Sequence, residues 1–249
     1  MFLEFGSAYT ISNESQRWAT SAVPNIHRVL TVAGSGDQAI FYKLAGAKIV
    51  DTFDITHNAG VVQNIKYAAI KKMDTPDDYK DFLVDLFYTT DVMSMPQMKN
   101  LKRHLTKYSR RTIDVNSGTQ MFCTGLDANA YPENIPTDSE FEKLKTILNK
   151  PFRFIQSDLE NVHAKIHGKY DLINLSNIFD YCYDGRTQAQ ILINMAKHLN
   201  VGGHIVYLPQ MPRFKYTDVH IKTKSGIELN YQDTKSYRDT KMILFQRTR

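Results

Sequence analysis

The chain has 249 residues, of which 42% are hydrophobic and 23% are charged. This ordinary globular composition excludes extended disorder and a fibrous fold for the chain as a whole, and the length suffices to bury a core without disulfides or metal. The formal net charge of +5 permits an anionic partner but does not require one.

The cysteines, the histidines and the N-terminal residues indicate the cellular compartment and whether a metal is expected. Cys123 and Cys182 lie far apart without metal-ligand spacing, and the eight histidines show no such spacing either. The N-terminus lacks the pattern of a secretory signal, and no apolar run reaches the roughly 20 residues of a membrane span. We therefore expect a cytoplasmic protein, in a reducing compartment, with inert cysteines and no metal.

Short apolar runs rich in β-branched and aromatic residues alternate with segments of helical spacing. The runs predict strands at Arg28–Ala33, Lys48–Phe53, Phe152–Gln156, Tyr170–Leu175 and His204–Leu208. The helical spacing predicts helices at Gln38–Leu44, Val61–Met73 and Arg186–Leu199. Strand–helix alternation is typical of a parallel sheet covered on both faces. We expect one α/β domain over residues 1–249.

The alternation breaks at residues 74–150, which we interpret as a helical insertion that caps the active face. Thr75 followed by Pro76 indicates a helix start, and a second helix is expected after Met95-Pro96. The rest of the insertion is expected to be loop. Further on, strands are expected at Lys215–Lys222 and Lys241–Gln246, with a polar hairpin or flap between them.

The segment Val29–Ala39 contains the strongest local signal for a ligand site. A buried strand ends in Gly34-Ser35-Gly36, and a helix begins at Asp37. Glycine allows the backbone to turn sharply and approach a ligand, and a helix N-terminus offers free N–H groups. An ordinary strand-to-helix turn would have the same sequence, so this signal needs support from other strand ends.

Polar residues follow the other predicted strands of the same sheet. Asp54 ends the second strand, where a carboxylate can accept both hydroxyls of a ribose. Asp158 follows the strand Phe152–Gln156 and is a candidate to accept an adenine amino group. Both acids could instead cap the next helix. We extend the predicted cofactor-binding set to the neighbouring and fourth-strand residues Ile55, Leu159, Asn174, Ser176 and Asn177, of which Asn174 and Ser176 could simply satisfy strand-end backbone groups.

These motifs, in this order, resemble class I S-adenosylmethionine-dependent transferases. The resemblance implies a Rossmann-like class I methyltransferase fold and S-adenosylmethionine as the donor. A narrower resemblance rests on VLTVAGSGDQAIFYKLAGAKIVDTFDI, QNIKYAAI, YKDFL, YDLINLSNIFDY and YRD. These segments are similar to the betaine-lipid-type S-adenosylmethionine:diacylglycerol 3-amino-3-carboxypropyl transferase family.

The narrower resemblance implies transfer of the 3-amino-3-carboxypropyl group, with methylthioadenosine as by-product. Tyr9, Glu14 and Asp180 are the catalytic candidates it suggests, acting on a small-molecule, phosphorylated or lipid acceptor. Two alternatives stay open: a methyltransferase, and a non-catalytic nucleotide- or nucleic-acid-binding protein. The basic stretch Lys99–Arg111 is expected to be a solvated helix face, with peripheral contact to an anionic membrane as an alternative and nucleic acid not favoured as a partner.

Overall fold

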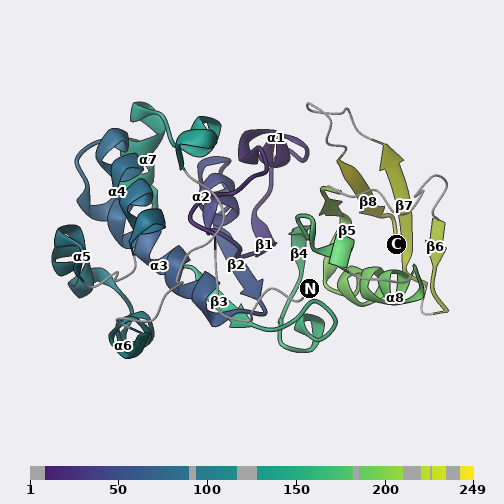
Figure 1. Cartoon of the computed structure of the whole chain (residues 1–249). Helices are drawn as coiled ribbons and strands as arrows, with labels where there is room; N and C mark the ends of the chain where they lie inside the picture. Colours follow the sequence, from purple (N-terminus) through teal and green to yellow (C-terminus); the bar gives the residue numbers. More distant parts are fainter. Residues whose placement is uncertain are drawn as a thin grey trace.

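The computed structural model of the chain describes residues 9–89, 94–116, 128–181, 185–209, 220–224, 226–233 and 242–249. Within these ranges the strands form one sheet in the order β3-β2-β1-β4-β5-β8-β7-β6 (Figure 1). The strands are β1 Arg28–Val32, β2 Ile49–Asp54, β3 Arg153–Gln156, β4 Tyr170–Asn174, β5 Leu199–Tyr207, β6 His220–Lys222, β7 Glu228–Asp233 and β8 Ile243–Arg247.

The sheet is mostly parallel, as the sequence predicts. Strands β1 to β5 pair in parallel, β8 lies antiparallel between β5 and β7, and β6 pairs antiparallel with β7. The chain proceeds from β1 outward to β2 and β3 on one side, and from β4 outward to β5 on the other. The order therefore reverses between β1 and β4, which is where open α/β sheets bind ligands at the carboxyl ends of their strands.

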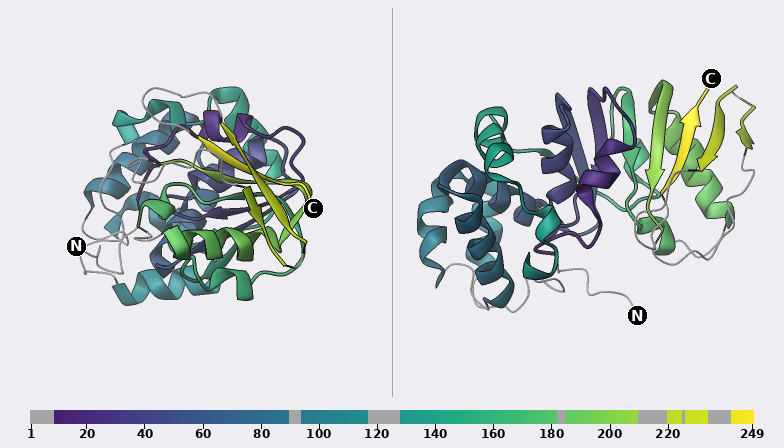
Figure 2. Two further views of the ribbon diagram at one scale, coloured as in Figure 1. Left: turned by 90° about the vertical axis from the view of Figure 1, so that its right-hand side faces the viewer. Right: turned by 90° about the horizontal axis from the view of Figure 1, so that it is seen from above.

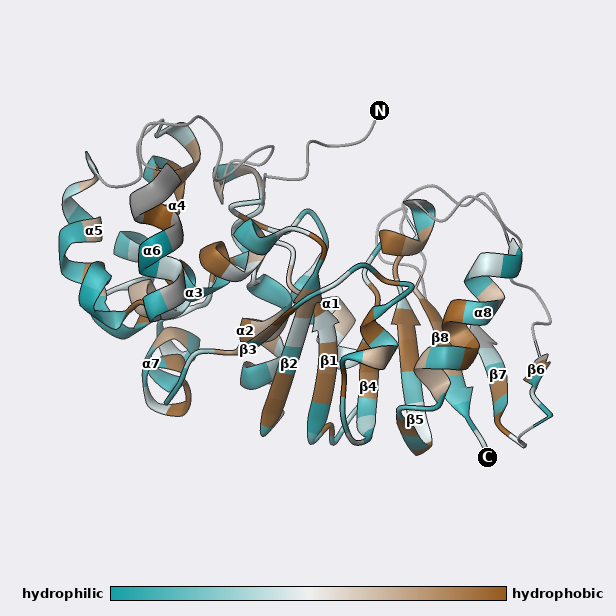
Figure 3. Cartoon of the chain, turned by 90° about the horizontal axis from the view of Figure 1, so that it is seen from below, coloured by the Kyte–Doolittle hydropathy of each residue, from teal (hydrophilic) through white to brown (hydrophobic). Residues whose placement is uncertain are grey.

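Two apolar layers cover the two faces of this sheet. Adjacent residues of a strand point to opposite faces, so Val29 packs with α1 and α2 whereas Leu30 packs with α8. The same alternation recurs at Leu172 and Ile173 of β4. Figure 3 shows the apolar residues of β1, β4 and β5 in the middle of the sheet. Burial on both faces explains why these strands are almost continuously hydrophobic.

The helices lie on both sides of the sheet and beyond one end of it (Figure 2). They are α1 Gln16–Ser21, α2 Asp37–Leu44, α3 His57–Lys72, α4 Pro76–Tyr88, α5 Pro96–Leu101, α6 Lys107–Asn116, α7 Asp138–Ile147 and α8 Gly185–Ala196. Short 3₁₀ turns include Lys102–His104 between α5 and α6, and Ile178–Tyr181 after β4. None of the described helices is both long and apolar enough to cross a membrane.

The insertion is more helical than the sequence analysis expects. Helix α4 begins as predicted, with a capping box in which Thr75 and Asp78 satisfy each other's backbone N–H groups. Helix α7, however, occupies a segment that was expected to be loop, and α6 continues past Arg111, where the expected helix face ends. The signal for α7 is present in the sequence, since Thr137 and Glu140 form a second capping box ahead of an apolar stripe.

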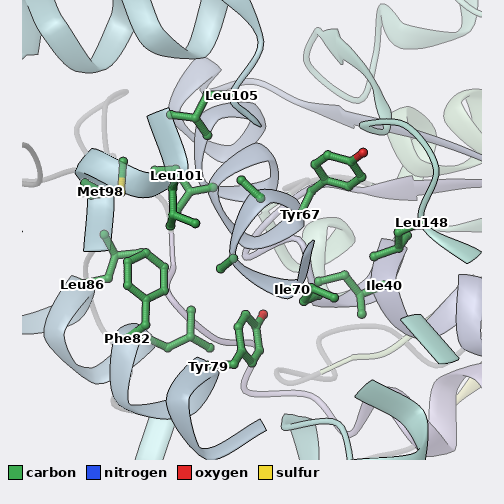
Figure 4. Close-up of a cluster of buried hydrophobic side chains, with 14 of the residues drawn as sticks. Ile40, Tyr67, Ile70, Tyr79, Phe82, Leu86, Met98, Leu101, Leu105 and Leu148 are labelled. Atoms are coloured by element: carbon green, nitrogen blue, oxygen red, sulfur yellow. The ribbon is translucent and has the colours of Figure 1, made fainter. Parts of the chain in front are cut away.

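A hydrophobic cluster joins the insertion to the rest of the fold. Figure 4 shows Tyr79, Phe82 and Leu86 of α4 beside residues from α2, α3 and α5. Tyr79 and Phe82 are at most 1% exposed. Full burial of a large apolar side chain such as Phe82 stabilises the fold by about 1.5–3 kcal/mol, so the insertion packs as part of this core.

The C-terminal region differs from expectation in detail. Strand β7 lies in the polar segment expected to form a hairpin, and it pairs with β6 across Thr223–Ile227. Helix α8 ends at Ala196, three residues earlier than predicted, because Leu199 already pairs with Tyr170 in the sheet. The expected strand residues 215–219 and 241, like Cys123 and Cys182, lie outside the described residues.

Candidate active site

The loop between β1 and α2 lies at the point where the strand order reverses. Gly34 and Gly36 have φ of +47° and +85°, a region that favours glycine. A Cβ on Gly36 would stand 3.0 Å from the Cα of Gln63 in α3. The loop therefore needs glycine at this position both for its backbone conformation and for its close packing against α3.

Asp54 ties this loop to the end of β2. Its Oδ2 accepts the backbone N–H of Gly34 at 3.0 Å, and its Oδ1 accepts the backbone N–H of Thr56 at 3.1 Å. Burial raises the pKa of Asp54, and the backbone N–H groups of Thr56, Gly34 and Ile55 oppose that rise. The hydrogen bonds from Gly34 and Thr56 use one acceptor position on each carboxylate oxygen, which can accept two. Asp54 can thus brace the loop and still accept two ligand hydroxyls.

Asp37 is committed to contacts within the protein. Its Oδ2 accepts the Ser12 backbone N–H and the Ser35 hydroxyl, both at 2.7 Å. Its Oδ1 forms an ion pair with Nζ of Lys66 at 2.5 Å, and both side chains are at most 2% exposed. This carboxylate joins the N-terminal segment, the glycine loop and α3. We expect Asp37 to shape the loop rather than to offer an acceptor to a ligand.

A buried polar cluster lies at the end of β4. Asn174 donates from Nδ2 to the Tyr42 hydroxyl at 3.0 Å and accepts the Ser176 backbone N–H at 2.8 Å. Ser176 has a φ of +51°, which is strained for a residue with a Cβ. Its hydroxyl donates to Oε1 of Glu14 at 2.6 Å. Strand β4 and the N-terminal segment therefore meet at the glycine loop.

Glu14 is the most perturbed carboxyl group of this cluster. Burial raises its pKa from 4.5 to about 7, hydrogen bonding with Ser176 and Gln38 opposes that rise, and the nearby charge of Asp180 adds to it. Its Oε2 is buried without a hydrogen-bond partner among the described residues, and so is Oε1 of Gln38. Gln38 also lies beside Gly34. Two buried acceptors without donors therefore lie next to the loop.

The remaining predicted residues lie around this cluster or apart from it. Asp158 accepts the backbone N–H and side-chain amide of Asn161 at 2.8–2.9 Å, in the turn before the 3₁₀ helix Val162–Ala164. Asp180 is buried and accepts the hydroxyl of Tyr207. Leu159 and Asn177 are half-buried, whereas Ile55 is 49% exposed and Tyr9 37% exposed.

Sequence reasoning missed three residues that build the site. Gln38 adds a buried acceptor, Ser12 holds Asp37 through its backbone, and Lys66 neutralises Asp37 from α3. Lys66 is 0% exposed. A lysine within the apolar stripe of Val62, Ile65 and Ala69 signals a buried ion pair, but its partner cannot be found from spacing. Only the fold brings α3 against the glycine loop.

Comparison with known proteins rests on structure. No protein-family model matches the chain. No curated protein matches it in sequence. The rRNA methyltransferase AviRa from Streptomyces viridochromogenes superposes with a TM-score of 0.52 at 12% identity, over 98% of this chain and 89% of that one. A putative rRNA-methylase from Clostridium thermocellum gives 0.44 at 10% identity, over 96% and 98%. The N-methyltransferase NodS from Bradyrhizobium japonicum WM9 gives 0.40 at 11% identity, over 93% and 89%.

These comparisons correct two expectations. The preference for aminocarboxypropyl transfer is overturned in favour of its alternative, because the structure that matches this fold is titled a methyltransferase. The expectation against nucleic acid as a partner is overturned by the same structure, which is titled an rRNA methyltransferase. At 12% identity the likeness concerns the fold. The chain has the Rossmann-like class I methyltransferase fold, as its sequence predicts.

Proposed function

We propose that the chain is an S-adenosylmethionine-dependent methyltransferase whose donor binds at the carboxyl ends of β1 and β4, where the strand order reverses. The observation that carries the proposal is the hydrogen bond between the Gly34 N–H and Asp54 Oδ2 at 3.0 Å, within this fold. It places a glycine loop, a helix N-terminus and a carboxylate at one point of the sheet edge. The nucleoside and the charged tail of the donor require these groups side by side.

The residues present fit the polar groups of S-adenosylmethionine. Asp54 keeps one acceptor position on each oxygen, which suits the two hydroxyls of the ribose. Glu14 Oε2 and Gln38 Oε1 are buried acceptors without donors. Such groups cost about 1–3 kcal/mol each when left unpaired. The ammonium group of the methionine portion carries three donors and a positive charge, and would satisfy both acceptors.

The bound donor would supply an electrophilic methyl carbon next to a sulfonium. The residues of the chain then have two tasks. Asp54, Glu14 and the loop hold the donor in one orientation, and positioning of this kind is worth several kcal/mol of barrier. Asp180, buried beside Tyr207 and close enough to Glu14 to raise its pKa, is the candidate to accept a proton from the group that is methylated. A catalytic role for Tyr9 stays a prediction.

The donor site is tested by calorimetry with S-adenosylmethionine. We expect Asp54→Ala to weaken binding about 10- to 100-fold, since a hydrogen bond to a charged group contributes about 1.5–3 kcal/mol. Asp158→Ala is the matched carboxylate control, and we expect a smaller effect because Asn161 already occupies its oxygens. Equal losses of affinity in the two variants would contradict binding of the nucleoside at the end of β2.

The reaction is tested by analysis of donor-derived products after incubation with total RNA. Methyl transfer releases S-adenosylhomocysteine and labels the acceptor with the methyl group. Release of methylthioadenosine would contradict methyl transfer. Tight binding of S-adenosylmethionine with no product from any acceptor would instead indicate a non-catalytic binding protein.

A further inference from the structure

The insertion carries a concentrated positive charge on α5, α6 and the 3₁₀ turn between them. Between Met95 and Ile113 the chain has six Lys and Arg residues and no Asp or Glu. We define the basic surface as the exposed members of this set that the argument uses: Lys99, Arg103, Lys107, Arg110 and Arg111. This one segment has a formal charge that exceeds the +5 of the whole chain.

The geometry of α6 displays its charges on one side. Lys107, Arg110 and Arg111 stand at positions i, i+3 and i+4, which share a helix face. Ser109 and Ile113 are 2% and 1% exposed and fix the opposite face against the fold. Because the buried face is settled by packing, the three cations project together to solvent.

Among the side chains that the structure describes, which do not include that of Asp114 in α6, no carboxylate neutralises the basic surface. None of its five side chains belongs to an ion pair there, although Arg17, Arg28 and Lys66 do. Arg103 instead donates from Nε to His104 Nε2 at 3.2 Å. Burial, together with the charges of Lys72 and Arg103, lowers the pKa of His104. These observations agree on a surface of uncompensated positive potential.

The basic surface is anchored next to the candidate active site. The Thr106 backbone N–H, immediately before α6, donates to Oδ1 of Asn64 at 2.8 Å. The preceding residue of α3, Gln63, packs against Gly36 of the glycine loop. Figure 3 shows α4, α5 and α6 beyond the β3 side of the sheet, displaced toward the ends to which β1 and β5 point. Helix α3 therefore joins the basic surface to the loop where the donor is proposed to bind.

The chemistry of this surface favours a phosphodiester backbone over a membrane. A helix that lies in a membrane interface needs an exposed apolar face beside its cations. Among the side chains that the structure describes, which do not include those of Tyr108 and Val115 in α6, the exposed large hydrophobic residues are Tyr9, Ile49, Ile55, Tyr88 and Val201, and none of these is on α5 or α6. Clustered Arg and Lys without apolar partners suit closely spaced phosphates.

We propose that the basic surface binds the phosphate backbone of an RNA substrate and presents it to the glycine loop. This inference rests on the proposed methyltransferase function, because it names the acceptor of that same site. Base identity would be read elsewhere, since lysine and arginine contacts to phosphates position a nucleic acid without specifying its sequence.

The test compares two triple variants that remove equal charge. Lys107→Gln/Arg110→Gln/Arg111→Gln neutralises the basic surface. Lys48→Gln/Lys169→Gln/Lys197→Gln is the control: these exposed lysines lie just before β2, β4 and β5, at the opposite edge of the sheet. Fluorescence anisotropy measures binding of a labelled RNA hairpin as a function of salt, and calorimetry measures binding of S-adenosylmethionine.

We expect the first triple variant to weaken RNA binding more than tenfold and to reduce the slope of log affinity against log salt by about 2 to 3. The control triple should bind RNA nearly as wild type does. Equal binding by both variants, equal losses in both, or no RNA binding by the wild type would overturn the inference. Preserved S-adenosylmethionine binding separates each of these outcomes from failure of the donor site.

Two further arms identify the source of the phosphates. A DNA duplex of the same sequence could bind as tightly as RNA and lose the same affinity in the first triple variant. That result would contradict RNA as the specific partner but would still support phosphate binding by the basic surface. Binding of phosphatidylserine-containing vesicles without binding of RNA would overturn the inference in favour of a membrane.

Discussion

At the residue scale, Glu14 shows how burial changes the chemistry of a carboxyl group. It lies in an N-terminal segment without regular structure, yet it is only 7% exposed. Its partner Ser176 is 162 positions away in the chain. The sequence indicates Glu14 only through a family resemblance, because nothing in the local pattern predicts either its burial or this contact.

This burial predicts a pH dependence of stability. The pKa of Glu14 rises from 4.5 to about 7 on folding. The folded state therefore holds the proton more tightly, so this contribution to stability is complete below pH 4.5 and is lost as the pH rises to 7. Glu14→Gln removes that loss. We expect the unfolding free energy of the variant, relative to wild type, to increase by about 2–3 kcal/mol between pH 5 and pH 8.

Urea unfolding at the two pH values measures this difference. Glu160→Gln, which replaces an exposed glutamate, is the control for loss of one carboxyl group. A stability difference for Glu14→Gln that does not change between pH 5 and pH 8 would show that Glu14 is already ionised throughout this range.

At the element scale, the loop from β1 to α2 depends on how closely α3 approaches it. The order strand, Gly-Ser-Gly, helix was readable from the sequence, and so was the acid at the end of β2. The approach of α3 was not, because it depends on Lys66 and Gln63 meeting the loop in the folded chain. Thr75 followed by Pro76 located α4 in advance, and capping boxes mark the starts of α4 and α7, because these interactions are local.

Alanine substitutions at two glycines distinguish the effect of backbone strain from the effect of the glycine loop on ligand binding. Gly36→Ala and Gly46→Ala both place a Cβ at positive φ, +85° and +102°. Each should destabilise the protein by about 1–2 kcal/mol. The Cβ at Gly36 would also meet Gln63 at 3.0 Å, whereas nothing lies within 4 Å at Gly46.

We therefore expect Gly36→Ala to weaken S-adenosylmethionine binding at least tenfold and Gly46→Ala to leave it unchanged. Calorimetry at a temperature where both variants are folded, verified by circular dichroism, provides the measurement. Weaker binding by Gly46→Ala of the same size would assign the effect to general loss of stability.

At the scale of the whole molecule, a ligand at the carboxyl ends of the strands would join segments that are distant in the chain. Its proposed contacts come from the N-terminal segment, the β1–α2 loop and the end of β2. Ligands that bind only the folded state stabilise it by about 2.7 kcal/mol at 100 times their dissociation constant. For a chain of this length we expect the Tm to rise by about 5–10 °C.

Thermal unfolding with and without S-adenosylmethionine measures this shift. Asp54→Ala should lose most of it at the same ligand concentration. Adenosine alone should give a smaller shift, because it lacks the ammonium group proposed to meet Glu14 and Gln38. An equal Tm shift with adenosine would contradict the proposed contact of Glu14 and Gln38 with the donor.

The sequence by itself determined the parallel sheet, the glycine loop and the acid at its edge. These features arise from local causes: hydrophobic periodicity, turn chemistry and the position of a residue at a strand end. Only the tertiary structure decided which polar groups meet there. The cluster of Glu14, Gln38, Ser176 and Asp180 and the ion pair of Asp37 with Lys66 join residues from distant parts of the chain. Burial raises the pKa of Glu14 and leaves acceptors of Glu14 and Gln38 without partners among the described residues, and sequence spacing does not show which buried polar groups meet.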